Sequence, residues 1–247
     1  MADFELISDK IKEFLSLDSD PVAVFLLSAG TDMHPFGGWK RLQKHRYCQA
    51  LMKARRAELV ILEAKELSCP AAAAAFGIRP LPTGLANGEA LVGFGIVEKA
   101  DTGRTMFENM PKLNPGSVEC IALCSLADAP RVPDVVVVEG EVEKLMWILL
   151  ADLNLAGGKR RGADTAVLQA TCVDATIIPY RENRLNFSYG CYGCREATDL
   201  GFSEAVLGFP GNMLEPLAKT VEYLCQRAIP RSRDKKAYQN LIENNAK

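Results

Sequence analysis

Residues 135–153, VVVVEGEVEKLMWILLADL, decide the fold, because a strand pattern leads directly into a helix pattern there. Residues 135–138 are four consecutive valines, which predicts a strand buried on both faces. From Val142 onward apolar residues recur every three or four positions, as on one face of a helix. Trp147 and Ile148 make the other side apolar too, so we expect this helix to be central.

The same two patterns recur along the chain. Helical spacing predicts helices over residues 4–15, 47–56, 69–77, 102–110 and 213–224. Apolar runs predict strands over residues 22–27, 59–62, 121–126, 166–179, 184–189 and 204–209. Residues 29–45, and 78–118 apart from one short helix, are rich in glycine, proline and charge and are expected to be loops. The sequence therefore predicts an α/β or α+β fold, with a mixed, largely buried sheet of at least five strands flanked by helices.

Composition limits the class of protein. A net charge of −2 over 247 residues argues against nucleic-acid binding, which needs a strong basic excess. Apolar runs stay short of the roughly 20 residues that span a membrane. The first residues are acidic and do not resemble a signal peptide. We therefore expect a cytoplasmic protein, with one globular domain over residues 1–229 and a polar, frayed tail over residues 230–247.

Eight cysteines are many for such a protein. Without a secretion signal they indicate metal binding, catalysis or buried thiols rather than a disulfide framework. Cys120 and Cys124 lie four apart in a predicted strand, where cysteine acts as a small hydrophobic residue. Cys225, in the last helix, is expected to be buried for the same reason.

Cys191 and Cys194 lie instead in the glycine-rich stretch GCYGCR, residues 190–195. A two-residue spacer lets both sulfurs face one centre, as in half of a zinc or iron–sulfur site, or in a redox dithiol. Cys48 and Cys69 are the candidates to complete the set. Each lies at a predicted helix start, where the helix dipole favours the thiolate. The alternative is that both are residues of the capping region without a partner.

Three basic residues flank these thiols: Lys44, Arg46 and Arg195. They would offset the charge of a thiolate-bound cluster or bind an anionic ligand. The alternative is that all three are ordinary surface charges that contact water. The chain has neither a phosphate-binding loop nor a dinucleotide-binding fingerprint, and its two histidines leave little for a hydrolytic triad.

The chain resembles the domain of unknown function 169 family of archaea and bacteria over about residues 20–215. The resemblance is carried, in order, by RYCQA from Arg46, SCPAAAAAFG from Ser68, PDVVVV from Pro133, GCYGCR from Gly190 and GFP from Gly208. The family is uncharacterised and common in anaerobes, which would suit an oxygen-sensitive cluster. The resemblance implies a shared cysteine site at Cys48, Cys69 and Cys191, with weaker matches at Cys172 and Cys194. Cys172 ends a predicted strand and could replace Cys194.

These observations lead to three functional hypotheses. The first is an iron–sulfur protein with an electron-transfer or redox-accessory role, which would need a redox protein partner or a small anionic ligand. The second is a structural zinc or dithiol site on a small-molecule-binding or interaction module. The third is an enzyme that uses Cys191 or Cys194 as a nucleophile activated by Arg195. The first two hypotheses predict that Cys48, Cys69 and the turn over residues 191–194 converge in space.

Overall fold

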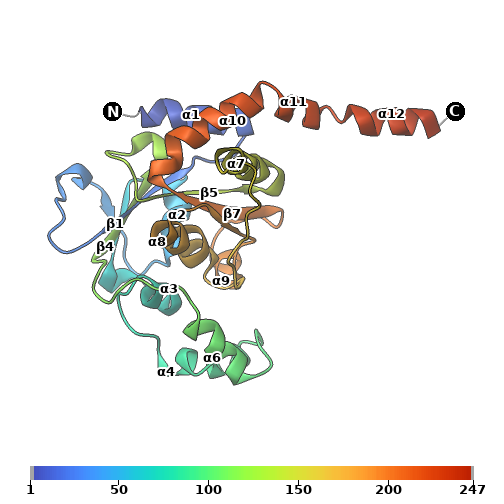
Figure 1. Cartoon of the computed structure of the whole chain (residues 1–247). Coiled ribbons are helices and arrows are strands. Elements are labelled where there is room, and N and C mark those ends of the chain that lie inside the picture. Colours follow the sequence, from blue (N-terminus) through green and yellow to red (C-terminus); the bar gives the residue numbers. More distant parts are fainter. Residues whose placement is uncertain (1–2, 246–247) are drawn as a thin grey trace.

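The computed structural model describes residues 3–245 and is built around a seven-stranded sheet of order β2-β3-β4-β1-β5-β7-β6 (Figure 1). The neighbouring strands pair antiparallel, except β2 and β3, which are parallel. The predicted mixed sheet with flanking helices is therefore confirmed. The ends of the predicted domain and tail, residues 1–2 and 246–247, lie outside the described residues. The strands are β1 Val22–Leu27, β2 Lys40–Arg41, β3 Val60–Glu63, β4 Cys120–Ser125, β5 Val135–Glu141, β6 Asn186–Ser188 and β7 Glu204–Pro210.

The central strands contribute to two separate cores because their side chains alternate between the faces of the sheet. In β1, Val22 and Val24 join one core, whereas Ala23 and Phe25 join the other. The valines of β5 divide in the same way. Both faces are covered, which explains why these strands are continuous apolar runs rather than alternating ones.

One face is covered by α1 (Phe4–Leu15), α7 (Val142–Leu155) and α10 (Leu214–Cys225), which lie above the sheet in Figure 1. Trp147 and Ile148 of α7 are buried, but Val142 and Met146 are 54% and 44% exposed. The helix is therefore not central as expected. It lies in the outer layer of helices, and some of its apolar side chains are exposed to solvent.

The other face carries α2 (Tyr47–Ala54), α3 (Pro70–Ala75), the π-helix η4 (Ala170–Ile177) and α8 (Ile178–Glu182), with α9 (Tyr192–Ala197) beside them (Figure 1). Pro70 occupies the first turn of α3, where a missing N–H costs nothing. The functional site described below lies on this side of the sheet.

The predicted strand over residues 166–179 is wrong, because residues 170–177 form η4 instead. All eight residues of η4 are buried, and an apolar run of this kind does not distinguish a buried helix from a buried strand. Thr176 Oγ1 donates to the Thr171 carbonyl oxygen at 2.8 Å, across one turn of the wide helix. Only tertiary packing against β7 and α3 distinguishes the two structures.

Residues 78–118 form a helical insertion rather than loops around one helix. They contain α4 (Thr83–Ala86), α5 (Glu89–Gly93) and α6 (Ala100–Glu108), of which only α6 was predicted. The three helices pack against one another and stand away from the sheet at the bottom of Figure 1. Gly88 has φ +83° and lies so close to Ala100 that a Cβ atom there would collide with its carbonyl oxygen, so glycine permits this packing.

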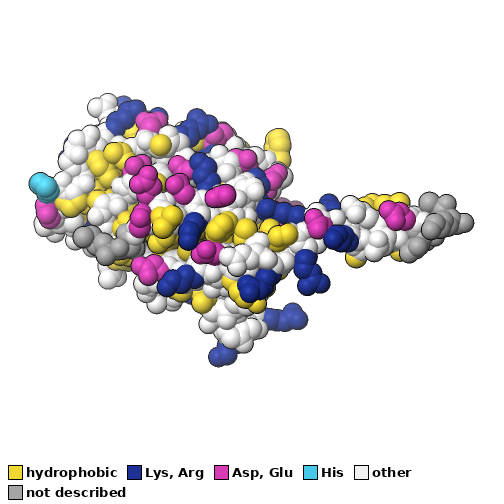
Figure 2. Space-filling view, turned by 90° about the horizontal axis from the view of Figure 1, so that it is seen from above, with side chains coloured by type: hydrophobic (Ala, Val, Ile, Leu, Met, Phe, Trp, Pro, Cys, Tyr) yellow, Lys and Arg dark blue, Asp and Glu magenta, His cyan; other side chains and the backbone are white. Residues whose placement is uncertain are grey.

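Residues 230–245 are helical instead of frayed. Helices α11 (Ala228–Arg233) and α12 (Lys236–Asn245) project as an arm beyond the body, and Figure 1 and Figure 2 both show it. Basic and acidic side chains are interspersed over the face in Figure 2. Across residues 3–245, we find no helix whose length and apolarity would let it cross a bilayer. Short 3₁₀ turns complete the chain: η1 His34–Phe36, η2 Ala64–Glu66, η3 Leu126–Asp128 and η5 Gly211–Met213.

Candidate functional site

A cavity of about 440 Å³ lies between α2, α3, η4, α9 and the helical insertion. Five of the eight cysteines line it, and they come from four separate parts of the chain: Cys48, Cys69, Cys172, Cys191 and Cys194. The other three do not line it. Cys120, Cys124 and Cys225 pack in or against the core on the opposite side of the sheet. The structure thus brings together every cysteine singled out by sequence as a candidate ligand, whereas the role of these cysteines in metal binding stays a prediction.

Two thiols of the cavity are in contact with each other. The Sγ atoms of Cys191 and Cys194 lie 2.9 Å apart. Cys191 is the N-cap residue of α9, and its Sγ accepts from the backbone N–H of Cys194 at 3.1 Å. Gly190, at φ +87°, turns the chain into this cap. Thr171 of η4 lies 3.2 Å from Cys194 Sγ through its hydroxyl oxygen. The Cys-x-x-Cys spacing therefore places both sulfurs on the cavity side of a helix start.

The remaining three thiols come from helices on the same face of the sheet. Cys48 is the second residue of α2, and Cys69 is the N-cap residue of α3. Both therefore lie at helix starts, as predicted. Cys172 was expected to end a strand, but it lies inside η4, where its thiol donates to the Gln169 carbonyl oxygen at 3.6 Å.

Three thiols of this cavity, those of Cys172, Cys191 and Cys194, have a raised pKa that favours the neutral form. The hydrogen bond to Cys194, together with burial, raises the pKa of Cys191 far above its ordinary value. The hydrogen bond that Cys194 accepts from Cys191 lowers its own pKa, but contact with Cys48 and burial outweigh this and raise it to about 12. Burial also raises the pKa of Cys172 well above the ordinary value. A thiol must lose its proton to act as a nucleophile, so the arrangement does not favour a cysteine-nucleophile enzyme.

The three predicted basic residues occupy three different environments. Arg46 lines the cavity, donates to the Gly193 carbonyl oxygen at 3.1 Å and pairs with Glu196 at 3.2 Å. Arg195 lines an adjoining groove instead, and its guanidinium donates to the carbonyl oxygens of Tyr189, Gly201 and Glu204. Lys44 is not among the residues that line the cavity. Arg195 therefore holds the backbone around the Cys-x-x-Cys turn, while Arg46 alone of the three faces the cavity.

Sequence reasoning missed the wall opposite the cysteines. The insertion supplies it with apolar side chains, namely Leu85, Ala90, Leu91, Phe94, Ile96 and Phe107. The glycines and prolines of residues 78–118 suggested loops, and the two short helices α4 and α5 are too brief to show a helical period. The apolar run at residues 90–92, between Gly88 and Gly93, was the one local signal for α5.

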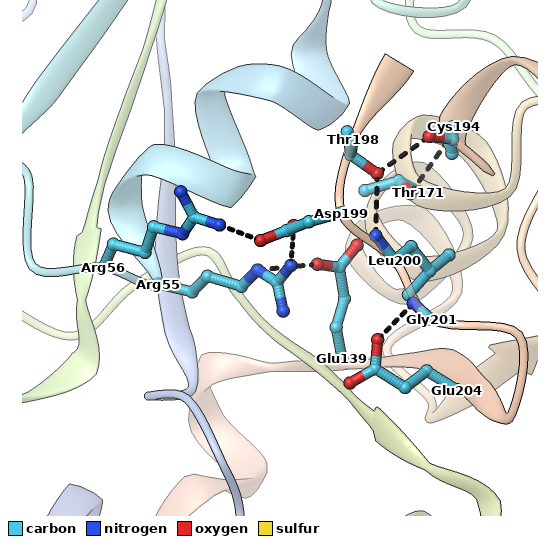
Figure 3. Close-up of polar contacts among 10 residues, drawn as sticks. All are labelled: Arg55, Arg56, Glu139, Thr171, Cys194, Thr198, Asp199, Leu200, Gly201 and Glu204. Atoms are coloured by element: carbon cyan, nitrogen blue, oxygen red, sulfur yellow. Dashed lines mark hydrogen bonds and ion pairs between the residues drawn. The ribbon is translucent and has the colours of Figure 1, made fainter. Parts of the chain in front are cut away.

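A charged network that the sequence did not reveal supports the C-terminal side of α9 (Figure 3). Thr198 donates to the Cys194 carbonyl oxygen through its N–H and its hydroxyl, at 3.0 and 2.7 Å. The next residue, Asp199, pairs with both Arg55 and Arg56 at the end of α2. Arg55 Nε also lies 3.3 Å from a carboxylate oxygen of the buried Glu139 on β5. The turn that carries the cysteines is thereby connected to α2 and to the central sheet.

The donor set suits a thiolate-ligated metal, although the side chains do not form a finished ligand shell. Within residues 3–245, no three His, Cys, Asp or Glu side chains are grouped closely enough to hold a metal ion as they stand. Five sulfurs nevertheless line one cavity, and its one carboxylate, that of Glu196, is paired with Arg46. Soft sulfur ligands select iron–sulfur clusters, zinc or copper(I) rather than magnesium or calcium.

Comparison with protein families gives one match. The family described as domain of unknown function 169, uncharacterised ArCR, matches residues 10–220. Neither the search of curated proteins nor the search of solved structures found a similar protein.

Proposed function

The chain belongs to the domain of unknown function 169 family, and we propose that it holds an iron–sulfur cluster in the cysteine-lined cavity and serves electron transfer or a redox enzyme. One observation carries the proposal. Five of the eight thiols line the same cavity, and two of them lie more than 100 residues before the other three in the sequence. The remaining three thiols lie in or against the opposite core. Packing alone does not require five thiols on one side of the sheet to line a single cavity.

Cys48, Cys69, Cys191 and Cys194 would hold the cluster. Each lies at or beside a helix start on the wall of the cavity, so the four sulfurs come from the ends of three helices. Cys172 lies mid-helix and already donates to a carbonyl oxygen, so we place it beside the ligands rather than among them. Because the thiols are not yet grouped as a shell, loading requires their side chains to reorient and lose their protons.

The cavity provides what such a centre needs from the protein. When bound, the cluster would supply reversible one-electron chemistry. The walls are mostly apolar, and limited solvent exposure together with hydrogen bonds to sulfur helps to set the reduction potential of a cluster. Arg46 is the one cation that lines the cavity and would offset part of the negative charge of four thiolates. A cavity of 440 Å³ is also far larger than a single ion requires, given that one water occupies about 30 Å³.

A second function is favoured by the contact between Cys191 and Cys194. Their sulfurs lie 2.9 Å apart, and a disulfide needs a separation of about 2.05 Å, so a small side-chain movement would join them. In that case the two thiols would lose two protons and two electrons to an external disulfide, which would be reduced to two thiols. The remaining cysteines would then be packing residues.

Anaerobic purification followed by iron, acid-labile sulfide and visible-absorption measurements tests the proposal. We expect iron and sulfide in the wild-type chain and at least about a tenfold loss of both in Cys48→Ser and Cys191→Ser, because each removes a ligand. Cys225→Ser is the matched control, since that thiol packs against the opposite core. It should retain the full metal content.

Other results would contradict the cluster. Stoichiometric zinc lost in the same variants would assign a structural zinc site. A colourless, metal-free protein in which Cys191 and Cys194 alone oxidise reversibly would assign the dithiol. Equal loss of iron in Cys225→Ser would show that the metal is bound adventitiously.

A further inference from the structure

We infer that the wall opposite the cysteines is a binding site for a small, uncharged, predominantly apolar molecule, held against the sulfur-bearing side of the same cavity. This ligand class adds to the proposed function. It rests on that function in one respect, namely that the thiols beside the ligand carry out redox chemistry. It is carried by the composition of the insertion wall, the charge balance of the cavity and its size.

The insertion presents an apolar surface to the thiols. Leu91 of α5 and Phe107 of α6 are 3% and 2% exposed and form its base. Leu85, Ala90, Phe94 and Ile96 complete it. A protein could shield a cluster from water simply by filling the space opposite its ligands with side chains. In this protein that space is a cavity instead. Here the two walls enclose about 440 Å³, within the roughly 300–1,000 Å³ typical of small-molecule sites.

The charges of the cavity favour a neutral ligand. Arg46 and Glu196 are the two charged residues that line it, and they pair with each other at 3.2 Å. The hydroxyl groups of Tyr47 and Thr171 also have partners, on Thr176 and Cys194. An ionic ligand would lose its hydration without gaining a free counter-charge, which is costly in an apolar site. This argues against the small anionic ligand considered from the sequence.

Access to the cavity lies between Phe94 and Tyr192. Both line the cavity and also the adjoining groove of about 680 Å³, and they are 65% and 59% exposed. Exposed aromatic side chains that border an apolar cavity are suited to admitting an apolar molecule from solvent.

Fluorescence titration with N-phenyl-1-naphthylamine, an uncharged probe, tests the inference on the anaerobically purified full-length protein. We expect saturable binding at one site per chain. The matched probe 8-anilinonaphthalene-1-sulfonate carries the same rings and an anionic group, and should bind at least about tenfold more weakly, because its charge finds no free partner. Equal or tighter binding of the anionic probe would overturn the inference.

Two insertion variants locate the bound probe. Ala90→Phe fills the cavity from α5 and should weaken binding of the uncharged probe at least about tenfold. Ala86→Phe is the matched control, because Ala86 is exposed on α4 and does not line the cavity. Phe94→Ser, at an exposed position, is a second variant that should also weaken binding even if Ala90→Phe fails to fold. Unchanged binding in Phe94→Ser and in folded Ala90→Phe would overturn the inference.

Measuring metal on the same samples separates this inference from the proposed function. Ala90→Phe and Phe94→Ser should keep the metal content of the wild-type chain, and Cys48→Ser should lose metal but still bind the uncharged probe within about threefold. Probe binding without metal would reject the cluster alone. Metal without saturable probe binding would reject the ligand site alone.

Discussion

Glu139 on β5 is a buried acidic residue whose carboxylate lacks a hydrogen bond to the described residues. Its side chain is 1% exposed and faces Arg55, yet neither carboxylate oxygen has a hydrogen bond within the described chain. Burial raises its pKa to about 7, even though the charge of Arg55 lowers it. Asp174 is buried beside Thr165 and Ser188, and burial raises its pKa to about 7 as well.

These pKa values predict a contribution to stability that is lost as the pH rises. Both carboxyls bind protons more tightly in the folded state than in the unfolded state, so their contribution to stability is largest below about pH 4 and is lost toward about pH 7. A pKa of about 7 instead of 4.5 corresponds to about 3 kcal/mol for Glu139. Most of this contribution is lost between pH 5 and pH 8, so Glu139→Gln should reduce the difference in unfolding free energy between these two pH values by about 2.5 kcal/mol.

Chemical denaturation at the two pH values measures this effect. The matched control is Glu141→Gln, on the same strand but exposed, which should keep the pH dependence of the wild-type chain. Asp174 should leave a residual slope in Glu139→Gln. A slope identical to that of the wild-type chain would show that Glu139 does not titrate as inferred.

At the scale of elements, the contact between η4 and β7 depends on Gly208. A Cβ atom at this position would lie 1.8 Å from the Ala175 carbonyl oxygen, which belongs to the backbone of η4 and cannot rotate away. Gly208→Ala should therefore push η4 from the sheet and destabilise the fold by about 3 kcal/mol. Because η4 carries Cys172 and Thr171, metal content should fall too.

Thermal and chemical unfolding test the substitution. Gly140→Ala on the adjacent strand β5 is the matched control, because its nearest neighbour would be a Leu17 methyl group at 3.5 Å, an ordinary contact. We expect a change of less than about 1 kcal/mol there. Equal destabilisation by the two substitutions would show that the close approach of η4 does not matter.

The predicted elements succeed where a pattern is local and fail where it is not. The strands β1, β4, β5 and β7 lie where continuous apolar runs predict them, and the helices α1, α2 and α10 lie where helical spacing predicts them. The π-helix η4 could not be predicted, because all eight of its residues are buried, the polar Thr171, Asp174 and Thr176 included, so no exposed polar face marks a helical period. Helices α4 and α5 are too short for a period and owe their stability to α6.

At the scale of the whole molecule, the C-terminal arm contributes little to the fold. The described side chains of residues 231–243 are exposed, whereas Ile229 of α11 is 2% exposed. Arg233 connects the base of the arm to the Leu15 carbonyl oxygen and to Glu143. Deletion of residues 235–247 should therefore lower the melting temperature by less than about 2 °C.

Differential scanning calorimetry checks this result. Ile229→Ala in the full chain provides the comparison, and should cost about 2–4 kcal/mol because it opens a cavity in the core. If the deletion lowered the melting temperature as much as Ile229→Ala, the arm would be part of the cooperative unit.

The sequence by itself determined the central strands of the sheet, their burial on both faces and which thiols, Cys172 apart, lie outside the strands, because these depend on neighbours along the chain. Cys191 and Cys194 stand in a glycine-rich turn and Cys48 and Cys69 at helix starts, whereas Cys120 and Cys124 share one face of a strand. Only the tertiary structure decided that Arg195 serves the backbone, that Glu139 is buried against Arg55 and that the insertion closes the cavity. These features bring together segments that lie many residues apart in the sequence. Local propensity does not predict which distant side chains will be buried against each other.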